Sequence, residues 1–227
     1  MVVKLPLHDF YPEGSPFKTE NFTVKDPTIE DEDRLFNPDR IKGGYALDDF
    51  VRGLLPEEAQ RQYGNMFLID RNFILYAVRV ALAMFGDTIE FRENIECSHC
   101  GASLREATID SEVFIPENRK FELKEGGYFI RFKLLTVSDQ NVMRKDPLMK
   151  SNFLTRTLYY VIDTIEKEES DITDKYALIR SIPISLGTKI REFLNTQYPR
   201  FDIFIKCGSC ESTIPFEMNE SFFWNKL

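Results

Sequence analysis

The sequence predicts an α+β fold in which a helical amino-terminal region precedes two β-hairpin knuckles separated by a helical insertion. Three observations lead to this prediction. Apolar residues recur at helical spacing in residues 47–55 and 70–85. Two runs that alternate apolar and polar residues, near 95–104 and 204–213, each contain a pair of cysteines. Between these runs, residues 136–198 return to helical spacing, so the two knuckles are expected to flank a helical segment.

The overall composition is that of a globular protein. With 227 residues, 43% hydrophobic and 29% charged, the chain can form one large or two small domains whose core needs no crosslinks. The net charge of −8 repels nucleic-acid phosphates and anionic membrane surfaces. The amino terminus lacks a long apolar stretch, and residues 73–85 are broken by Arg79 and too short to span a bilayer. We therefore expect a soluble, unexported protein that binds neither nucleic acid nor membrane.

Residues 1–27 are predicted to form an extended arm, because four prolines and a glycine interrupt them. Within the arm, the run FYPEG is a turn candidate and ENFTVKD a strand candidate. An arm of this kind needs a surface to lie on. A helical region is expected to follow in residues 28–87.

Thr28 is a suitable N-cap for a short helix that ends near Asn37, and the acids of residues 30–33 fill its first turn. A second helix is expected within residues 43–55. The clearest helix runs from Asp70, its expected N-cap, to Phe85. This last helix is apolar nearly all round, which is typical of a central helix.

Residues 88–227 are predicted to form a zinc-ribbon-like domain that contains both knuckles. A strand leads into each cysteine pair and another follows it. The glycines Gly126 and Gly127, set between two strand-like runs, predict a further hairpin.

The insertion, about residues 136–198, is expected to begin with a short helix capped by Thr136 or Ser138. A longer helix is predicted from Ser151 to about Glu168. Its inward side chains are expected to be Phe153, Leu154, Leu158, Val161, Ile162 and Ile165. Two more helices are predicted in residues 173–182 and 185–197.

All four cysteines of the chain, Cys97, Cys100, Cys207 and Cys210, lie in two CxxC pairs. In a reducing compartment such pairs are more often metal ligands than disulfides. Two tight turns that each present two thiolates complete a tetrahedral shell around one zinc ion. Gly101 and Gly208 are expected to give the two turns room to bend. The sequence therefore predicts one structural zinc, with a redox dithiol, free thiols and crosslinks as alternatives.

Other candidate ligands and catalytic groups have simpler structural interpretations. His99 lies between two cysteines, where it is expected to be an exposed turn residue, and His8 is isolated in the arm. Arg71 and Arg79 lie on the most apolar helix and are expected to pair with carboxylates or carbonyls. The acidic runs at residues 30–33 and 166–170 favour helix ends over a cation site. Phosphate loops, metalloprotease motifs and a nucleophile elbow are absent from the sequence, so we expect no enzyme and no small-molecule substrate.

Aromatic residues at both ends of the chain are candidate partner-binding groups. Phe10 and Tyr11 lie in the arm, and Phe222, Phe223 and Trp224 form an apolar tail that is a candidate to dock on this protein or on a neighbour.

Several motifs occur in a recognisable order. They are LPLHDFYPEG, EDEDRLFNPDRIKGG, LIDRNFILYAVRVALAMFG leading into CSHCG, then KCGSC, and FF near the end. This ordered set resembles the baseplate hub proteins of T-even-type contractile-tailed bacteriophages and their marine and soil relatives. The opening FYPEG and the DRNFxLYAVR helix before the first cysteine pair are the most specific of these motifs, while residues 136–197 add little.

The resemblance implies a non-enzymatic protein of tail baseplate assembly, either built into the hub or acting while the hub forms. Its partners would be other tail and baseplate proteins, and it would be found in the virion tail or in an assembly intermediate in the host cytoplasm. The zinc is inferred from the cysteines and is not implied by the resemblance. A zinc-ribbon regulator that binds nucleic acid and a dithiol oxidoreductase are the alternative functions, and the acidic composition disfavours the first.

Overall fold

The computed structural model describes residues 1–81, 87–168 and 170–216. The chain divides into two compact units. The first unit comprises Met1–Val113 with Arg200–Leu227, and the second comprises Phe114–Pro199. Each unit contains both helices and a sheet, so the predicted α+β class is confirmed. Among the described residues, no helix combines the length and apolar character needed to cross a bilayer.

The amino-terminal segment folds onto the helices of its own unit. Strand β1 (Val2–Val3) pairs antiparallel with β2 (Phe22–Thr23), which lies in the run predicted to be a strand. A short 3-10 helix, η1 (His8–Phe10), lies between them. Four apolar side chains of this segment are fully buried: Leu5, Leu7, Phe17 and Val24. The segment therefore contributes to the core of the first unit.

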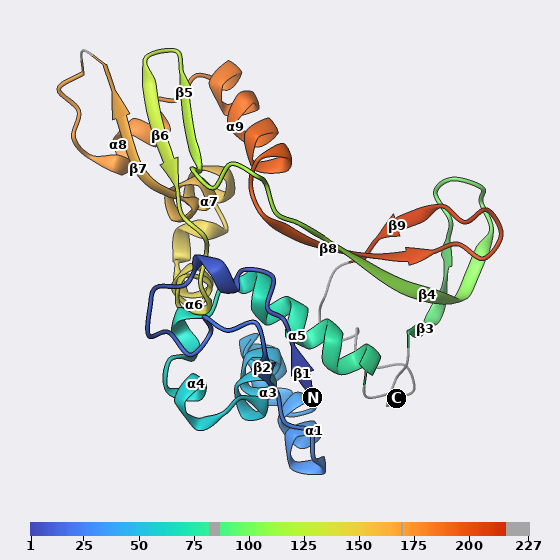
Figure 1. Ribbon diagram of the computed structural model, residues 1–227. Coiled ribbons are helices and arrows are strands. Elements are labelled where there is room, and N and C mark those ends of the chain that lie inside the picture. The colour runs from blue at the N-terminus through green and yellow to red at the C-terminus, as the bar shows by residue number, and fades with distance from the viewer. Residues whose placement is uncertain (82–86, 169, 217–227) are drawn as a thin grey trace. The chain divides into compact units, whose positions relative to one another are not determined.

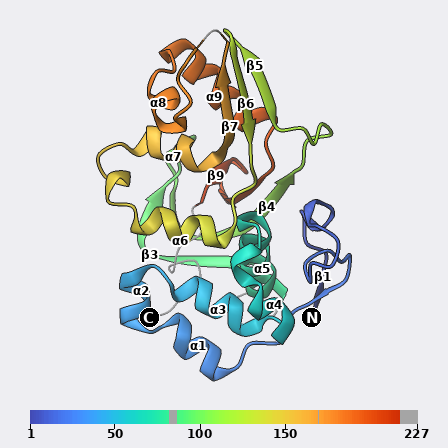
Figure 2. The same cartoon turned by 90° about the vertical axis from the view of Figure 1, so that its left-hand side faces the viewer.

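Five α-helices follow. They are α1 (Ile29–Leu35), α2 (Pro38–Gly43), α3 (Ala46–Leu54), α4 (Glu57–Arg61) and α5 (Leu68–Ala81), with the 3-10 helix η2 (Tyr63–Asn65) before the last. The predicted cap is confirmed: Thr28 Oγ1 accepts a hydrogen bond from the Asp31 N–H, and the Asp31 carboxylate accepts one from the Thr28 N–H. Figure 2 shows α1, α2 and α3 gathered beside one another.

Helix α5 begins two residues earlier than predicted. Because the helix starts at Leu68, Asp70 lies in its first turn, and the prediction that Asp70 is the N-cap was wrong. The expected end near Phe85 lies outside the described residues. The two arginines of α5 pair as predicted: Arg71 lies 3.2 Å from the Asp48 carboxylate, and Arg79 donates to the Thr88 carbonyl at 2.9 Å.

The first unit also contains a four-stranded sheet in the order β3-β4-β8-β9 (Figure 1). Its strands are β3 (Thr88–Glu96), β4 (Ser103–Phe114), β8 (Arg200–Lys206) and β9 (Thr213–Pro215). Both β3 with β4 and β8 with β9 pair antiparallel. The two hairpins, distant in sequence, thus lie in one sheet because β4 and β8 are neighbours.

The second unit has a three-stranded antiparallel sheet in the order β5-β6-β7. Its strands are β5 (Glu122–Glu125), β6 (Tyr128–Phe132) and β7 (Ile162–Lys167), and its helices are α6 (Val137–Lys145), η3 (Pro147–Met149), α7 (Phe153–Val161), α8 (Lys175–Arg180) and α9 (Ile184–Thr196). The predicted hairpin at Gly126 and Gly127 is confirmed, and both glycines have positive φ, as a two-residue turn of this hand requires. Thr136 caps α6.

The long helix predicted from Ser151 to Glu168 was wrong in its second half. Helix α7 ends at Val161, and β7 follows directly and pairs with β6. The β-branched residues Ile162, Thr164 and Ile165 suit a strand, and β6 offers an edge that needs a partner. The inward placement of Phe153 and Leu154 was also wrong, because each is 62% exposed. The insertion between the knuckles is therefore a mixture of helix and sheet.

Candidate metal centre

The turn that contains the first cysteine pair is closed by its own backbone. Strand β3 leads into Cys97, whose N–H donates to the Ala102 carbonyl at 2.8 Å. The Gly101 N–H donates back to the Cys97 carbonyl at 2.8 Å. Gly101 has a φ of +72°, a left-handed conformation that glycine adopts without strain. The predicted role of Gly101 is therefore confirmed.

The second turn repeats this arrangement. The Cys207 N–H donates to the Ser212 carbonyl at 3.0 Å, and the Glu211 N–H donates to the Cys207 carbonyl at 2.8 Å. Glu211 has a φ of +57°, and no other non-glycine residue in the described part of the chain has a positive φ. The prediction for Gly208 was wrong: the left-handed residue of this turn is Glu211, and a Cβ added to Gly208 would meet nothing within 4 Å.

The two knuckles are equivalent residue by residue. Adding 110 to each number of the first knuckle gives the second, so Cys97 corresponds to Cys207 and Gly101 to Glu211. The strand register follows the same rule. Ile95 pairs with Leu104 in the first hairpin, and Ile205 pairs with Ile214 in the second. The chain therefore builds the same hairpin twice and places both copies in one sheet.

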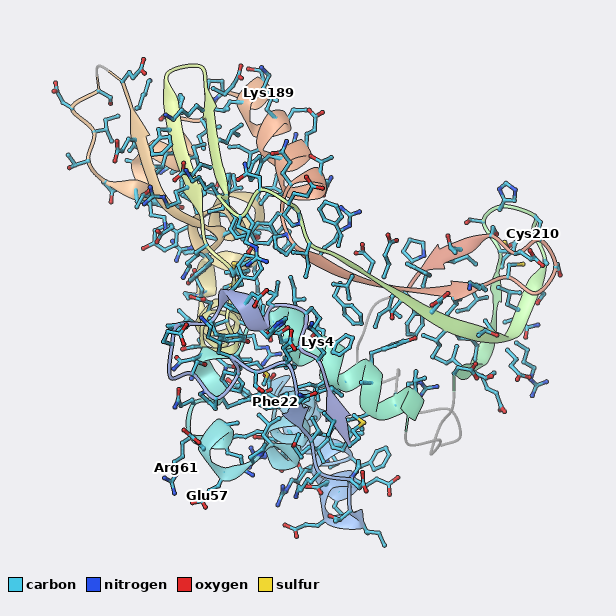
Figure 3. All side chains as sticks on the ribbon, viewed as in Figure 1. Lys4, Phe22, Glu57, Arg61, Lys189 and Cys210 are labelled. Carbon is cyan, nitrogen blue, oxygen red and sulfur yellow. The ribbon has the colours of Figure 1, made fainter. Side chains whose placement is uncertain are left out.

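The four sulfur atoms converge. All four Sγ atoms lie within 4.8 Å of one another. The Cys97 and Cys210 sulfurs are 3.8 Å apart, and so are those of Cys100 and Cys207. Each close pair joins one knuckle to the other (Figure 3 labels Cys210 at this position). Zinc with four thiolates at about 2.3 Å places its tetrahedral sulfurs about 3.8 Å apart, so these residues fit such an ion.

Burial repeats between the knuckles as well. The first cysteine of each pair, Cys97 or Cys207, is 1% exposed and packs with Leu104 in a small apolar cluster. Of the second cysteines, Cys100 is exposed and Cys210 is half-buried. Apolar packing therefore restricts access of water to the Cys97 and Cys207 sulfurs.

Hydrogen bonds favour thiolates at two of the four positions. The Ser212 hydroxyl lies 3.4 Å from the Cys97 sulfur and 2.9 Å from that of Cys210. It is the main cause of a lowered pKa for both thiols, to about 6 for Cys97. For Cys100, the Ala102 N–H lowers the pKa, but the neighbouring sulfurs raise it to about 12. Thiolates this close repel one another, so the site is suited to a divalent cation.

A family comparison adds independent information. The family described as "T4 bacteriophage base plate protein" matches residues 12–224, nearly the whole chain. The chain belongs to this T4 baseplate protein family. No curated protein and no solved structure matches it. This match confirms the resemblance to T4-type baseplate proteins that the sequence motifs indicated.

The remaining candidate residues of this baseplate protein have varied positions. His99 is exposed in its turn, as predicted. Tyr11 is 3% exposed, and its hydroxyl is bonded within the chain to Asp70 and to the Phe67 N–H. Phe10 is half-buried in η1. The tail residues Phe222, Phe223 and Trp224 lie outside the described residues, and partner binding by all of these aromatics stays a prediction.

Sequence reasoning missed Ser212 and Glu211. Ser212 corresponds to Ala102 in the first knuckle, so the repeat itself gives no sign of its contacts with sulfur. Glu211 was detectable, because aligning the two CxxC pairs sets it opposite Gly101. A residue aligned with a left-handed glycine is expected to share that conformation.

Proposed function

We propose that this protein is a non-enzymatic structural or assembly component of the baseplate hub. Membership of the baseplate family carries the proposal. The four-cysteine site agrees with it, because four protein ligands leave no position open for a substrate.

The metal in this proposal is one structural zinc in a zinc-ribbon-like pair of knuckles, bound by Cys97, Cys100, Cys207 and Cys210. When bound, the ion supplies a fixed crosslink and no reaction. The chain leaves the first unit at Val113 and returns at Arg200, so an ion between the hairpins ties the strand that precedes the second unit to the strand that follows it.

Metal analysis of purified, reduced protein tests the zinc. We expect one equivalent of zinc in the wild type, a loss of zinc in Cys97→Ser and Cys207→Ser, and full zinc content in the matched control His99→Ala. Well under one equivalent in the wild type, with folding indifferent to chelators, would remove the zinc from the proposal.

The function is tested by a quantitative mass-spectrometric inventory of purified phage particles and of partly assembled baseplates. We expect this chain in defined copy number in one or both. Its absence from both would overturn the hub assignment. A salt-dependent shift of labelled DNA or RNA at near-physiological ionic strength would support the nucleic-acid regulator instead. Against that alternative, Lys206, a cation beside the second knuckle, already pairs with the Asp110 carboxylate at 2.5 Å.

A further inference from the structure

Residues 142–154 of the second unit include several exposed apolar side chains. The most exposed are Phe153 and Leu154, each 62% exposed at the start of α7. Val142 on α6 is 53% exposed and Leu148 in η3 is 42% exposed. The Asn152 N–H donates to the Leu148 carbonyl at 2.9 Å, so Leu148 lies one turn before Phe153. Exposed apolar residues grouped in this way mark a surface that another molecule covers.

The charges on this stretch have one sign. Lys145 and Lys150 are exposed between the apolar residues. Asp146 is the single acid between residues 140 and 161, and its side chain is 5% exposed because Arg156 and Tyr160 both bond to it. We call Val142, Lys145, Leu148, Lys150, Phe153 and Leu154 the α6–α7 surface. Figure 2 labels the helices α6 and α7 from which it comes. This surface is basic and apolar in a protein of net charge −8.

We propose that the α6–α7 surface docks an acidic, amphipathic segment of another baseplate protein. Apolar side chains of that segment would cover Phe153 and Leu154, and its carboxylates would face Lys145 and Lys150. Burial of the apolar groups supplies the affinity, and the charge match fixes orientation and speeds association.

Other occupants fit this surface less well. Recognition of anionic lipid commonly uses four to eight clustered cations, and the net charge of −8 repels both membranes and nucleic acids. A symmetric contact between two copies of this surface would bring like charges together. A carboxylate-bearing partner avoids both difficulties.

The proposal rests on the hub function for the identity of the partner, and a crosslinking experiment tests it. A photoreactive benzoylphenylalanine replaces Phe153 in the full-length chain, which is expressed in phage-infected cells and irradiated. Mass spectrometry then identifies the peptide joined to residue 153. A matched protein carries the same photoreactive residue at Ile184, which is 88% exposed on α9.

We expect residue 153, and not residue 184, to crosslink to one defined segment rich in Asp or Glu and apolar residues in a second phage protein. Crosslinks to another copy of this chain, to its own residues 217–227, to lipid or to nucleic acid would each overturn the proposal. So would the absence of any crosslink specific to residue 153.

The crosslinked segment, made as a fluorescent peptide, then serves as the probe for binding to the purified full-length chain. We expect Phe153→Ser with Leu154→Ser, and separately Lys145→Glu with Lys150→Glu, to weaken binding roughly tenfold or more. The controls Ile184→Ser and Lys120→Glu, at exposed positions of the same unit, should stay within about twofold. Equal losses in controls and test variants would overturn the proposal, and circular dichroism of every variant identifies failures of folding.

The two proposals fail in distinguishable ways. If the particle inventory contains this chain but residue 153 gives no specific crosslink, the docking surface is wrong and the hub function stands. If the chain is absent from particles and assembly intermediates while the crosslink to an acidic segment of another protein forms, the hub function is wrong and the docking surface stands.

Discussion

The Tyr11 hydroxyl donates a 2.8 Å hydrogen bond to the Asp70 carboxylate across 59 residues of sequence. The other carboxylate oxygen accepts the Leu7 N–H at 2.9 Å, and the Tyr11 oxygen in turn accepts the Phe67 N–H at 2.8 Å. Asp70 is fully buried. A buried carboxylate with these donors fixes the amino-terminal segment onto the start of α5.

We expect Tyr11→Phe to lower the free energy of unfolding by about 1–3 kcal/mol, because it leaves a buried carboxylate oxygen and a backbone N–H without their shared hydroxyl. Urea denaturation followed by circular dichroism measures this change. Tyr176→Phe is a suitable control, since it removes a hydroxyl for which the structure describes no hydrogen bond. Equal stability of the Tyr11 variant and the wild type would contradict the role assigned to this hydroxyl.

Asp70 is also expected to make stability depend on pH. Burial raises the pKa of its carboxyl to about 6, against the opposing hydrogen bonds from Leu7 and Tyr11 and the nearby His8. The unfolded-state pKa is about 4. Between these values the folded protein binds more protons than the unfolded chain, so the contribution of Asp70 to stability falls as pH rises through this window.

The unfolding free energy of the wild type, measured relative to that of Asp70→Asn, should therefore fall by up to roughly 3 kcal/mol between pH 4 and 6.5. The difference between the two unfolding free energies should be constant above about pH 7. Urea titrations at half-unit intervals of pH provide the comparison. A difference between the two proteins that does not vary with pH would show that the pKa of Asp70 is the same in the folded and unfolded states.

Glu211 adopts a left-handed conformation that costs a side-chain-bearing residue about 1 kcal/mol relative to glycine. Glu211→Gly should therefore raise the free energy of unfolding by up to about 1 kcal/mol, and Gly101→Ala should lower it by a similar amount. Gly208→Ala is the matched control and should be close to neutral, because its Cβ has open space. Denaturation in the presence of excess zinc isolates the backbone effect. A stabilising Gly101→Ala would contradict the equivalence of the two knuckles.

Ser212 bonds to sulfurs from both knuckles, so its hydroxyl is expected to change the affinity of the proposed metal site. Ser212→Ala should weaken zinc binding about tenfold at neutral pH, as removal of hydrogen bonds to metal ligands commonly does. Competition with a chromophoric chelator measures this affinity. Ser209→Ala, an exposed position in the same turn, should leave the affinity unchanged. An equal effect of the two substitutions would argue against a specific role for the Ser212 hydroxyl.

Local sequence signals predicted local structure well. Thr28 and the acids after it mark the start of α1, and Gly126 with Gly127 marks a hairpin, because in each case neighbouring residues supply the whole interaction. The four cysteines were likewise identifiable as candidate metal ligands from their spacing alone. Their convergence, expected from zinc chemistry, depends on β4 and β8 becoming neighbours in one sheet.

Residues 162–167 show where such signals fail. The run fits a helix by spacing and a strand by its β-branched residues, and pairing with β6 decides the outcome. The prediction for Phe153 and Leu154 fails for another reason, since apolar character alone does not distinguish a core position from an exposed one. The role of Ser212 depends on the contact between knuckles that lie more than a hundred residues apart.

The distance of 107 residues between Cys100 and Cys207 has a consequence during synthesis. At translation rates of about 5–20 residues per second, the first pair of thiols leaves the ribosome roughly 5–20 s before the second. Until then the nascent chain offers a metal two ligands, too few for a closed tetrahedral shell. Capture of a zinc ion by the proposed site would consequently be a late event, which follows synthesis of the whole intervening unit through Cys210.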